Sequence, residues 1–129
     1  MEGGLKALTI RQPWAWAIIH GGKDIENRSW NTRLRGTIAI HAGFAYEKDA
    51  ELPRGVKRPH DDEIVRGAII GVADIVDVVE RHRSKWFSGP LGFVLANARA
   101  LARPIPCPGK LSLWEVPPII VKAIETQLN

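Results

Sequence analysis

The sequence has very little cysteine and no long apolar run. Cys107 is its single cysteine, so an internal disulfide is excluded, and a Cys-rich zinc site is excluded with it. No stretch reaches the roughly 18 consecutive apolar residues that span a bilayer, and the first ten residues contain no apolar run typical of a signal peptide. We therefore expect a cytoplasmic protein with no membrane partner and no obligate protein partner.

Motifs for metal binding and for nucleophilic catalysis are also missing. The four histidines show no metal-ligand spacing, and neither an H-E-x-x-H pattern nor a G-x-S-x-G elbow is present. These absences disfavour a structural metal and a serine hydrolase. We expect a function that needs no cofactor.

Positive charge is present but unevenly distributed. Residues 1–60 contain 10 lysines and arginines against 6 acidic residues, whereas residues 61–129 contain 8 of each. This asymmetry favours an anionic partner near the N-terminal elements, with nucleic acid the commonest candidate. The alternative is that the excess charge serves solubility alone.

Length and patterning predict one α+β domain over residues 1–129. Apolar alternation and β-branched runs predict strands at residues 5–10, 37–42, 67–79, 92–101 and 111–116, with residues 27–32 extended. Helical spacing predicts helices at residues 13–20, 46–52 and 119–128. Short strands with glycine-rich turns and a few short helices are typical of a small β-barrel with helices packed at its ends.

The strongest strand signal is GAIIGVADIVDVV at residues 67–79. Because this segment is so apolar, we expect it to pair on both edges in the middle of the sheet. Asp74 and Asp77 fall on opposite faces of a regular strand, so one of them faces inward unless a bulge intervenes.

The densest chemistry lies in GGKDIENR at residues 21–28. Two glycines can end the preceding helix and fix the angle at which Lys23 leaves it. In an extended continuation Glu26 and Arg28 share one side, within reach of Lys23. Such a cluster suits a polar, planar ligand, and the alternative is a surface ion pair without a function.

Several blocks of the sequence resemble the ASCH-domain family of the PUA-like superfamily. They are LTIRQPW, GGKDIENR, IHA, GPLGFVL and GKLSLWE, and the second block meets the family motif G-x-K-x-x-E-x-R at every fixed position. The resemblance implies a PUA-like β-barrel with a cleft between barrel and helix that holds the motif residues, and it implies binding of RNA.

We therefore expect a module that binds RNA or a modified nucleoside. Lys23, Glu26 and Arg28 would contact the polar edges of the ligand, and Trp14 and Trp30 would supply a stacking face, although packing in the core is the alternative for each tryptophan. Two further basic residues would contact nucleic-acid phosphates in a salt-dependent way, namely Arg33 and Arg35.

The resemblance also leaves an enzymatic alternative in the same cleft. Some relatives are amidohydrolases of N4-acylated cytidine, and one is a ribonuclease that uses a divalent metal. Lys23 and Glu26 would then be catalytic. In the amidohydrolases the motif lysine works with a threonine and a later glutamate, but Glu26 stands at the threonine's position, and the nearest candidates for the later acid are Asp74 and Asp77.

Overall fold

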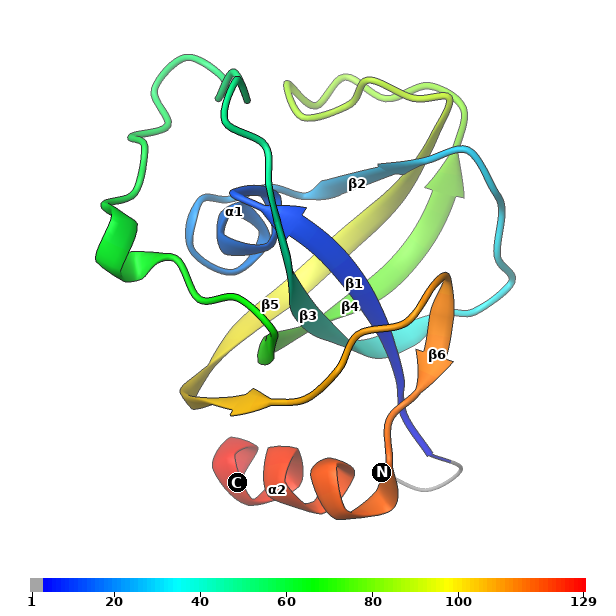
Figure 1. Cartoon of the computed structure of the whole chain (residues 1–129). Coiled ribbons are helices and arrows are strands. Elements are labelled where there is room, and N and C mark those ends of the chain that lie inside the picture. The colour runs from blue at the N-terminus through cyan, green and yellow to red at the C-terminus, as the bar shows by residue number, and fades with distance from the viewer. Residues whose placement is uncertain (1–3) are drawn as a thin grey trace.

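The computed structural model describes residues 4–129 and shows a mixed six-stranded sheet with two α-helices (Figure 1). The elements are β1 (Lys6–Gln12), α1 (Trp14–His20), β2 (Ile25–Arg28), β3 (Gly36–Tyr46), a 3-10 turn (Asp61–Glu63), β4 (Ala68–Val79), β5 (Leu91–Pro106), β6 (Leu113–Glu115) and α2 (Pro118–Leu128). This composition confirms the α+β prediction.

Strand β4 lies in the middle of the sheet, as its apolar sequence predicts. The strand order is β2-β5-β4-β3-β1-β6, and β4 pairs antiparallel with both β3 and β5. The first strand, β1, pairs in parallel with β3 on one side and antiparallel with β6 on the other. Both long edges of β4 are therefore protected, and the prediction for residues 67–79 is confirmed.

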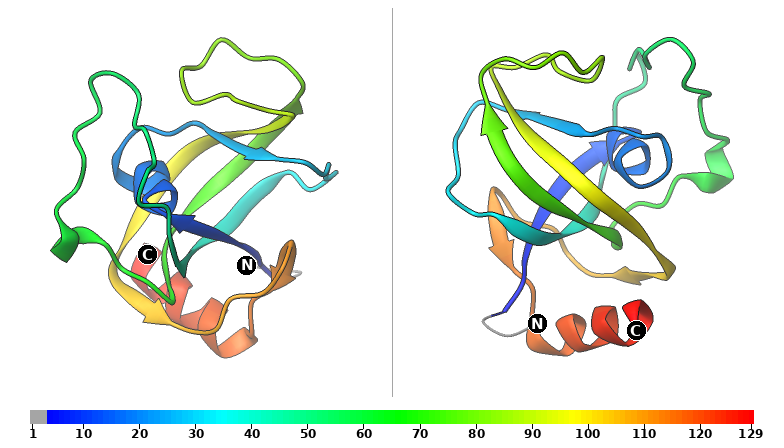
Figure 2. Two further views of the ribbon diagram at one scale, coloured as in Figure 1. Left: turned by 45° about the horizontal axis from the view of Figure 1, so that its top comes forward. Right: turned by 180° about the vertical axis from the view of Figure 1, so that it is seen from behind.

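The sequence predicts a closed or nearly closed β-barrel, and closure is not confirmed, because the sheet coils strongly but stays open (Figure 2). Its two edges are the shortest strands, β2 with four residues and β6 with three. β2 pairs only with β5, and β6 pairs only with residues 6–8 of β1. Edges this short do not meet. Helices α1 and α2 lie at opposite ends of the coiled sheet instead.

Helix α1 approaches the sheet closely because β4 carries a glycine beneath it. A Cβ atom on Gly71 would lie 2.5 Å from the carbonyl oxygen of Arg99 and 2.6 Å from Cδ1 of Ile19. Ile18, on the same helix, is buried in the main apolar cluster. The end of α1, where the motif begins, is thereby fixed against the sheet.

The helix predicted at residues 46–52 is wrong. Strand β3 continues to Tyr46, which pairs with Gln12 of β1, and the amide of Glu47 donates to the carbonyl of Gln12 at 2.8 Å. Only one turn follows, in which Ala50 N–H donates to the Glu47 carbonyl. Pairing between strands therefore prevails over the local helical spacing.

The two acids of β4 are separated by one register shift between β4 and β5, at Ile75/Asp77, and both avoid the core. Asp77 is exposed, whereas Asp74 is half-buried and accepts hydrogen bonds from Thr37 at 2.7 Å and Asn97 at 3.0 Å. Burial raises the pKa of Asp74, but these two hydrogen bonds and the charge of Arg99 together outweigh it and leave the pKa lowered. A bulge therefore intervenes, as the alternative prediction required, and neither acid has to face the core.

Replacing Asp74 by asparagine should lower the free energy of unfolding by about 1 kcal/mol at neutral pH, because two donors lose a charged acceptor. A group whose pKa is lower in the folded state stabilises the fold fully above its unfolded value, here 3.8, and loses that effect as pH falls through the folded value. Urea unfolding across pH should show the difference disappearing in acid. Asp77→Asn is the control, and an equal effect there would contradict the prediction.

Candidate functional site

The motif begins at the glycine stop of helix α1. The amides of Gly21 and Lys23 both donate to the carbonyl of Ala17, at 2.8 and 3.0 Å, and Gly22 takes a φ of +75°. A non-glycine residue seldom adopts that conformation. The turn directs the Lys23 side chain back beneath the helix, and the predicted helix stop is confirmed.

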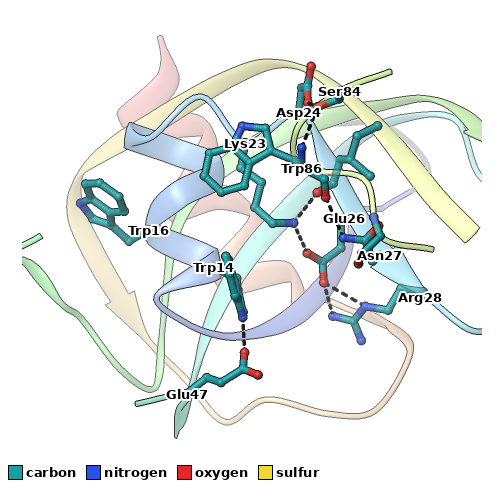
Figure 3. Close-up of polar contacts among 12 residues, drawn as sticks. Trp14, Trp16, Lys23, Asp24, Glu26, Asn27, Arg28, Glu47, Ser84 and Trp86 are labelled. Carbon is teal, nitrogen blue, oxygen red and sulfur yellow. Dashed lines mark hydrogen bonds and ion pairs between the residues drawn. The ribbon is translucent and has the colours of Figure 1, made fainter. Parts of the chain in front are cut away.

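A chain of charges follows the turn, with two buried members, Lys23 and Glu26, and a half-buried third, Arg28 (Figure 3). Lys23 is 5% exposed and Glu26 is 6% exposed. The Lys23 ammonium donates to Glu26 Oε1 at 2.8 Å, while Arg28 donates to Glu26 Oε2 through Nε at 3.0 Å. Arg28 also donates to the carbonyl of Thr9 at 3.1 Å. Glu26 is therefore held between two cations, one of which anchors it to β1.

The Lys23 ammonium keeps one donor that has no acceptor among residues 4–129. An ammonium carries three protons. Two of them have acceptors among the described residues, Glu26 Oε1 and the carbonyl of Ile25. The nitrogen lies 6.0 Å from the ring centroid of Trp14. A ligand beside this pair would meet a charged donor and a carboxylate acceptor side by side.

The Lys23–Glu26 pair faces a cavity of about 350 Å³, which we call the motif cavity. Trp14 and Trp86 stand at its wall with their rings nearly perpendicular, at 89°, and their centroids 6.5 Å apart. The indole N–H of Trp14 donates to Glu47. The complete lining is Trp14, Lys23, Glu26, Asn27, Glu47, Glu51, Pro53, Lys85, Trp86, Phe87 and Ser88.

The loop that carries Trp86 is tied to the motif by a residue between its fixed positions. Asn27 donates to the Trp86 carbonyl at 2.9 Å and accepts from the amides of Ser88 and Gly89 at 2.9 and 3.0 Å. One side chain of β2 thus positions an aromatic residue that is 59 positions away in sequence.

We expect Asn27→Ala to release this loop. The amides of Ser88 and Gly89 lose their acceptor, so their hydrogen exchange should accelerate by about tenfold or more. NMR exchange measurements resolve the two amides individually.

Asn31→Ala provides the matched control for Asn27→Ala, since within the described part of the chain the Asn31 side chain bonds only to the neighbouring amide of Thr32. Unchanged protection of Ser88 and Gly89 in Asn27→Ala would show that another contact holds the loop.

The structure brings together only part of the predicted site. Lys23, Glu26 and Trp14 line the cavity. Arg28 supports Glu26 from behind, and Trp30 packs edge-to-face on Phe93 with centroids 5.2 Å apart, so neither lines the cavity.

Four further polar candidates also lie outside the cavity lining. Arg33 and Arg35 are exposed in the segment between β2 and β3, and Asp74 and Asp77 lie on β4. The acids that do line the cavity beside Glu26 are Glu47 and Glu51.

Sequence reasoning missed four residues of this site: Asn27, Glu47, Trp86 and Phe87. The sequence did contain a signal for Trp86 and Phe87. Two adjacent aromatic residues before a Gly-Pro turn are unusual in an otherwise basic, polar loop. Asn27 gave none, because its role depends on a loop that only the fold brings near.

Residues 4–129 contain no group of three or more histidine, cysteine, aspartate and glutamate side chains placed to hold a metal ion. Within the same residues, neither helix has the length and apolar character needed to cross a membrane.

The fold is a small α+β domain, in which a coiled sheet carries a short helix at one end. A Lys-Glu-Arg chain follows the end of that helix and lines one side of the motif cavity through Lys23 and Glu26. Residues 8–106 match the model of the ASCH domain. The chain belongs to the ASCH domain family, which confirms the resemblance seen in its sequence.

Relatives and solved structures agree with this assignment. The chain is 25% identical over 132 residues to Activating signal cointegrator 1 from Homo sapiens and 24% identical to that protein from Mus musculus; each match covers 89% of this chain but 22% of the relative. It thus spans less than a quarter of their length.

The crystal structure of ASCH from Zymomonas mobilis superimposes with a TM-score of 0.58 at 18% identity, covering 94% of this chain and 93% of that chain. A serine-to-alanine mutant of that protein gives 0.56, also at 18% identity, with 94% of both chains covered. At this identity the likeness concerns the fold alone.

Proposed function

We propose that the motif cavity binds a single nucleobase or nucleoside, free or as part of an RNA. The observation that carries the proposal is that two tryptophan rings and the Lys23–Glu26 pair line one cavity. Aromatic rings stack on any base, and a donor beside an acceptor matches the polar edge of a base such as cytosine.

The charges of the cavity support a base rather than a phosphate as its occupant. Three glutamates line it, Glu26, Glu47 and Glu51, against the two cations Lys23 and Lys85. A phosphate would be repelled by exposed carboxylates, whereas an uncharged base edge is not. Its volume also lies at the small end of ligand pockets in proteins.

A neighbouring groove suits the phosphates of an RNA strand better. It is lined by Lys57, Arg58 and Lys85 against the single acid Glu63, and Lys85 lines the motif cavity as well. Arg58 donates to Tyr46 and to the carbonyl of Ala50, so it also shapes this loop. A strand with one base in the cavity would run along this groove.

Binding of nucleosides tests the proposal directly. Cytidine, N4-acetylcytidine and uridine are titrated into the protein while tryptophan fluorescence is followed. Trp86→Leu should weaken binding by about tenfold or more, because stacking contributes on the order of 1–3 kcal/mol per base. Trp30→Leu is the matched control and should leave affinity unchanged once both variants are shown to be folded. Loss of binding only in Trp30→Leu would place the site elsewhere.

The strand arm of the same experiment uses a short single-stranded RNA at two ionic strengths. The double variant Lys57→Ala, Lys85→Ala should bind more weakly and show a reduced salt dependence. The double variant Arg33→Ala, Arg35→Ala removes the same amount of charge from the segment between β2 and β3, where the sequence predicted phosphate contacts. A loss confined to the arginine pair would move the phosphate path to that segment.

The enzymatic alternative is read out in the same samples. Chromatography would detect cytidine released from N4-acetylcytidine, or RNA fragments formed with added magnesium. The Lys23 ammonium donates to two acceptors, Glu26 Oε1 and the carbonyl of Ile25, and this arrangement favours a binding role. Turnover that is lost in Lys23→Ala would establish an enzyme instead.

A further inference from the structure

His41 of β3 carries a buried polar atom that the motif cavity does not use. The ring is 1% exposed, and Nε2 lies 2.7 Å from the carbonyl oxygen of Cys107. A carbonyl only accepts, so Nε2 carries the proton, and in the neutral ring Nδ1 is then an acceptor. Nδ1 has no partner in residues 4–129. Burial lowers the pKa of His41, with the Cys107 hydrogen bond opposing that shift, which agrees with a neutral ring.

A hydroxyl and a glycine lie beside this atom. Thr9 Oγ1 accepts a hydrogen bond from the Trp114 indole at 3.0 Å, which leaves the threonine proton available. A Cβ atom on Gly109 would lie 2.7 Å from Thr9 Oγ1 and 3.0 Å from His41 Nδ1. Because Gly109 has no side chain, its backbone packs directly against the Thr9 hydroxyl and the His41 imidazole.

Thr9, His41 and Gly109 line a second hollow, the His41 recess, of about 350 Å³ between β1, β3 and the segment that joins β5 to β6. Figure 1 shows that segment running across β1 and β3. Its lining residues include Thr9, His41, Phe44, Gly109 and Leu111, none of which lines the motif cavity.

The rim of the recess is apolar and accessible. Phe44 is 74% exposed and Leu111 is 92% exposed, and they are two of the four large apolar side chains that are exposed in the described part of the chain. The Phe44 ring lies directly over Gly67, where the lack of a Cβ makes room for it. A buried acceptor at the base of an accessible apolar hollow is the arrangement of a ligand site.

We propose that the His41 recess is a second binding site, which takes a small uncharged ligand with one hydroxyl or amide N–H donor on an apolar ring. The donor bonds Nδ1 of His41, the neighbouring Thr9 hydroxyl can donate back, and the ring packs against Phe44 and Leu111. Lys110 at the rim disfavours a cationic ligand. The proposal is independent of the function of the motif cavity.

Phenol is a minimal probe of this chemistry, and anisole is its matched control because its ring is the same but its oxygen has no proton. Long-range ¹⁵N NMR follows His41 Nδ1 during titration of each compound. We expect phenol to shift Nδ1 and to bind at least about tenfold more tightly than anisole, because it satisfies a buried acceptor. Equal affinities, or no shift at Nδ1, would overturn the proposal and leave the atom to a buried water.

Variants locate the bound probe. Gly109→Ala adds a methyl group beside Thr9 Oγ1 and His41 Nδ1, and it should abolish the phenol-dependent shift of His41 Nδ1. Leu111→Ala removes an exposed wall, does not threaten folding and should weaken binding severalfold. Ile119→Ala removes an equally apolar, 80% exposed residue on α2 and should have no effect. Phenol binding that persists unchanged in both Gly109→Ala and Leu111→Ala would also overturn the proposal.

Discussion

Lys23→Ala should weaken binding of the ligand of the motif cavity by about a hundredfold, and Glu26→Ala should do so by a similar factor. Each residue holds the other in place at 2.8 Å in a buried setting. Removing one partner of a buried, hydrogen-bonded charge pair costs on the order of 2–5 kcal/mol in binding. The double variant should lose little more than either single variant, because coupled residues are not additive.

The measurement is a double-mutant cycle with cytidine, N4-acetylcytidine or a short RNA, followed by tryptophan fluorescence. Strictly additive losses, or full binding in Lys23→Ala, would mean that the pair has no role in the site. The exposed pair of Lys6 and Glu115, 3.6 Å apart, offers a matched control, in which substitution should leave both ligand binding and stability nearly unchanged.

The same variants should differ in stability. Lys23→Ala leaves Glu26 paired with Arg28, whereas Glu26→Ala leaves two cations without their carboxylate. Glu26→Ala should therefore lower the free energy of unfolding by about 3 kcal/mol or more, and Lys23→Ala should cost clearly less. Urea unfolding separates this effect from the loss of binding.

Gly71→Ala should destabilise the domain by about 3 kcal/mol, the upper part of the range for overpacked cores. Its new methyl group would meet a backbone oxygen, that of Arg99, and the side chain of Ile19 on α1. A backbone oxygen in the middle of the sheet cannot move without breaking the pairing of β4 with β5. The contact with Ile19 additionally pushes helix α1 away from the sheet, and we expect Lys23, which follows α1, to shift with it.

Urea unfolding measures the loss of stability, and nucleoside titration measures the displacement of the site. Gly43→Ala is the matched control, because its nearest neighbour would be a methyl group of Thr9 at 3.1 Å, which can give way. We expect that variant to lose less than about 1 kcal/mol. If the Gly71→Ala protein were as stable as the Gly43→Ala control, α1 would not be closely packed against β4 and the prediction would be wrong.

What could be predicted from the sequence was local. The Lys23–Glu26 pair is three residues apart, and the glycines that turn it directly precede it, so short-range geometry sufficed. The apolar run of β4 likewise indicated a central strand. The motif matched the family at every fixed position, and the family assignment is confirmed.

What could not be predicted depends on distant partners. Trp86 lines the cavity because Asn27 holds its loop. Glu47 is not helical, because its amide bonds the Gln12 carbonyl and its carboxylate bonds the Trp14 indole. Closure of a barrel depends on whether the two edge strands, here β2 and β6, are long enough to meet. The sequence of one edge strand by itself does not determine this. Helical spacing at residues 46–52 carried no information about the strand beside it.

The position of β1 also has a consequence for how the chain folds. Lys6 pairs with Ile38 on one side and with Glu115 on the other, so the first strand is completed by almost the last segment of the domain. Such a fold has a high contact order, and domains of this kind fold slowly because distant segments must meet before their contacts form. During synthesis on a ribosome, the outer edge of β1 stays unpaired until residues 113–115 have emerged.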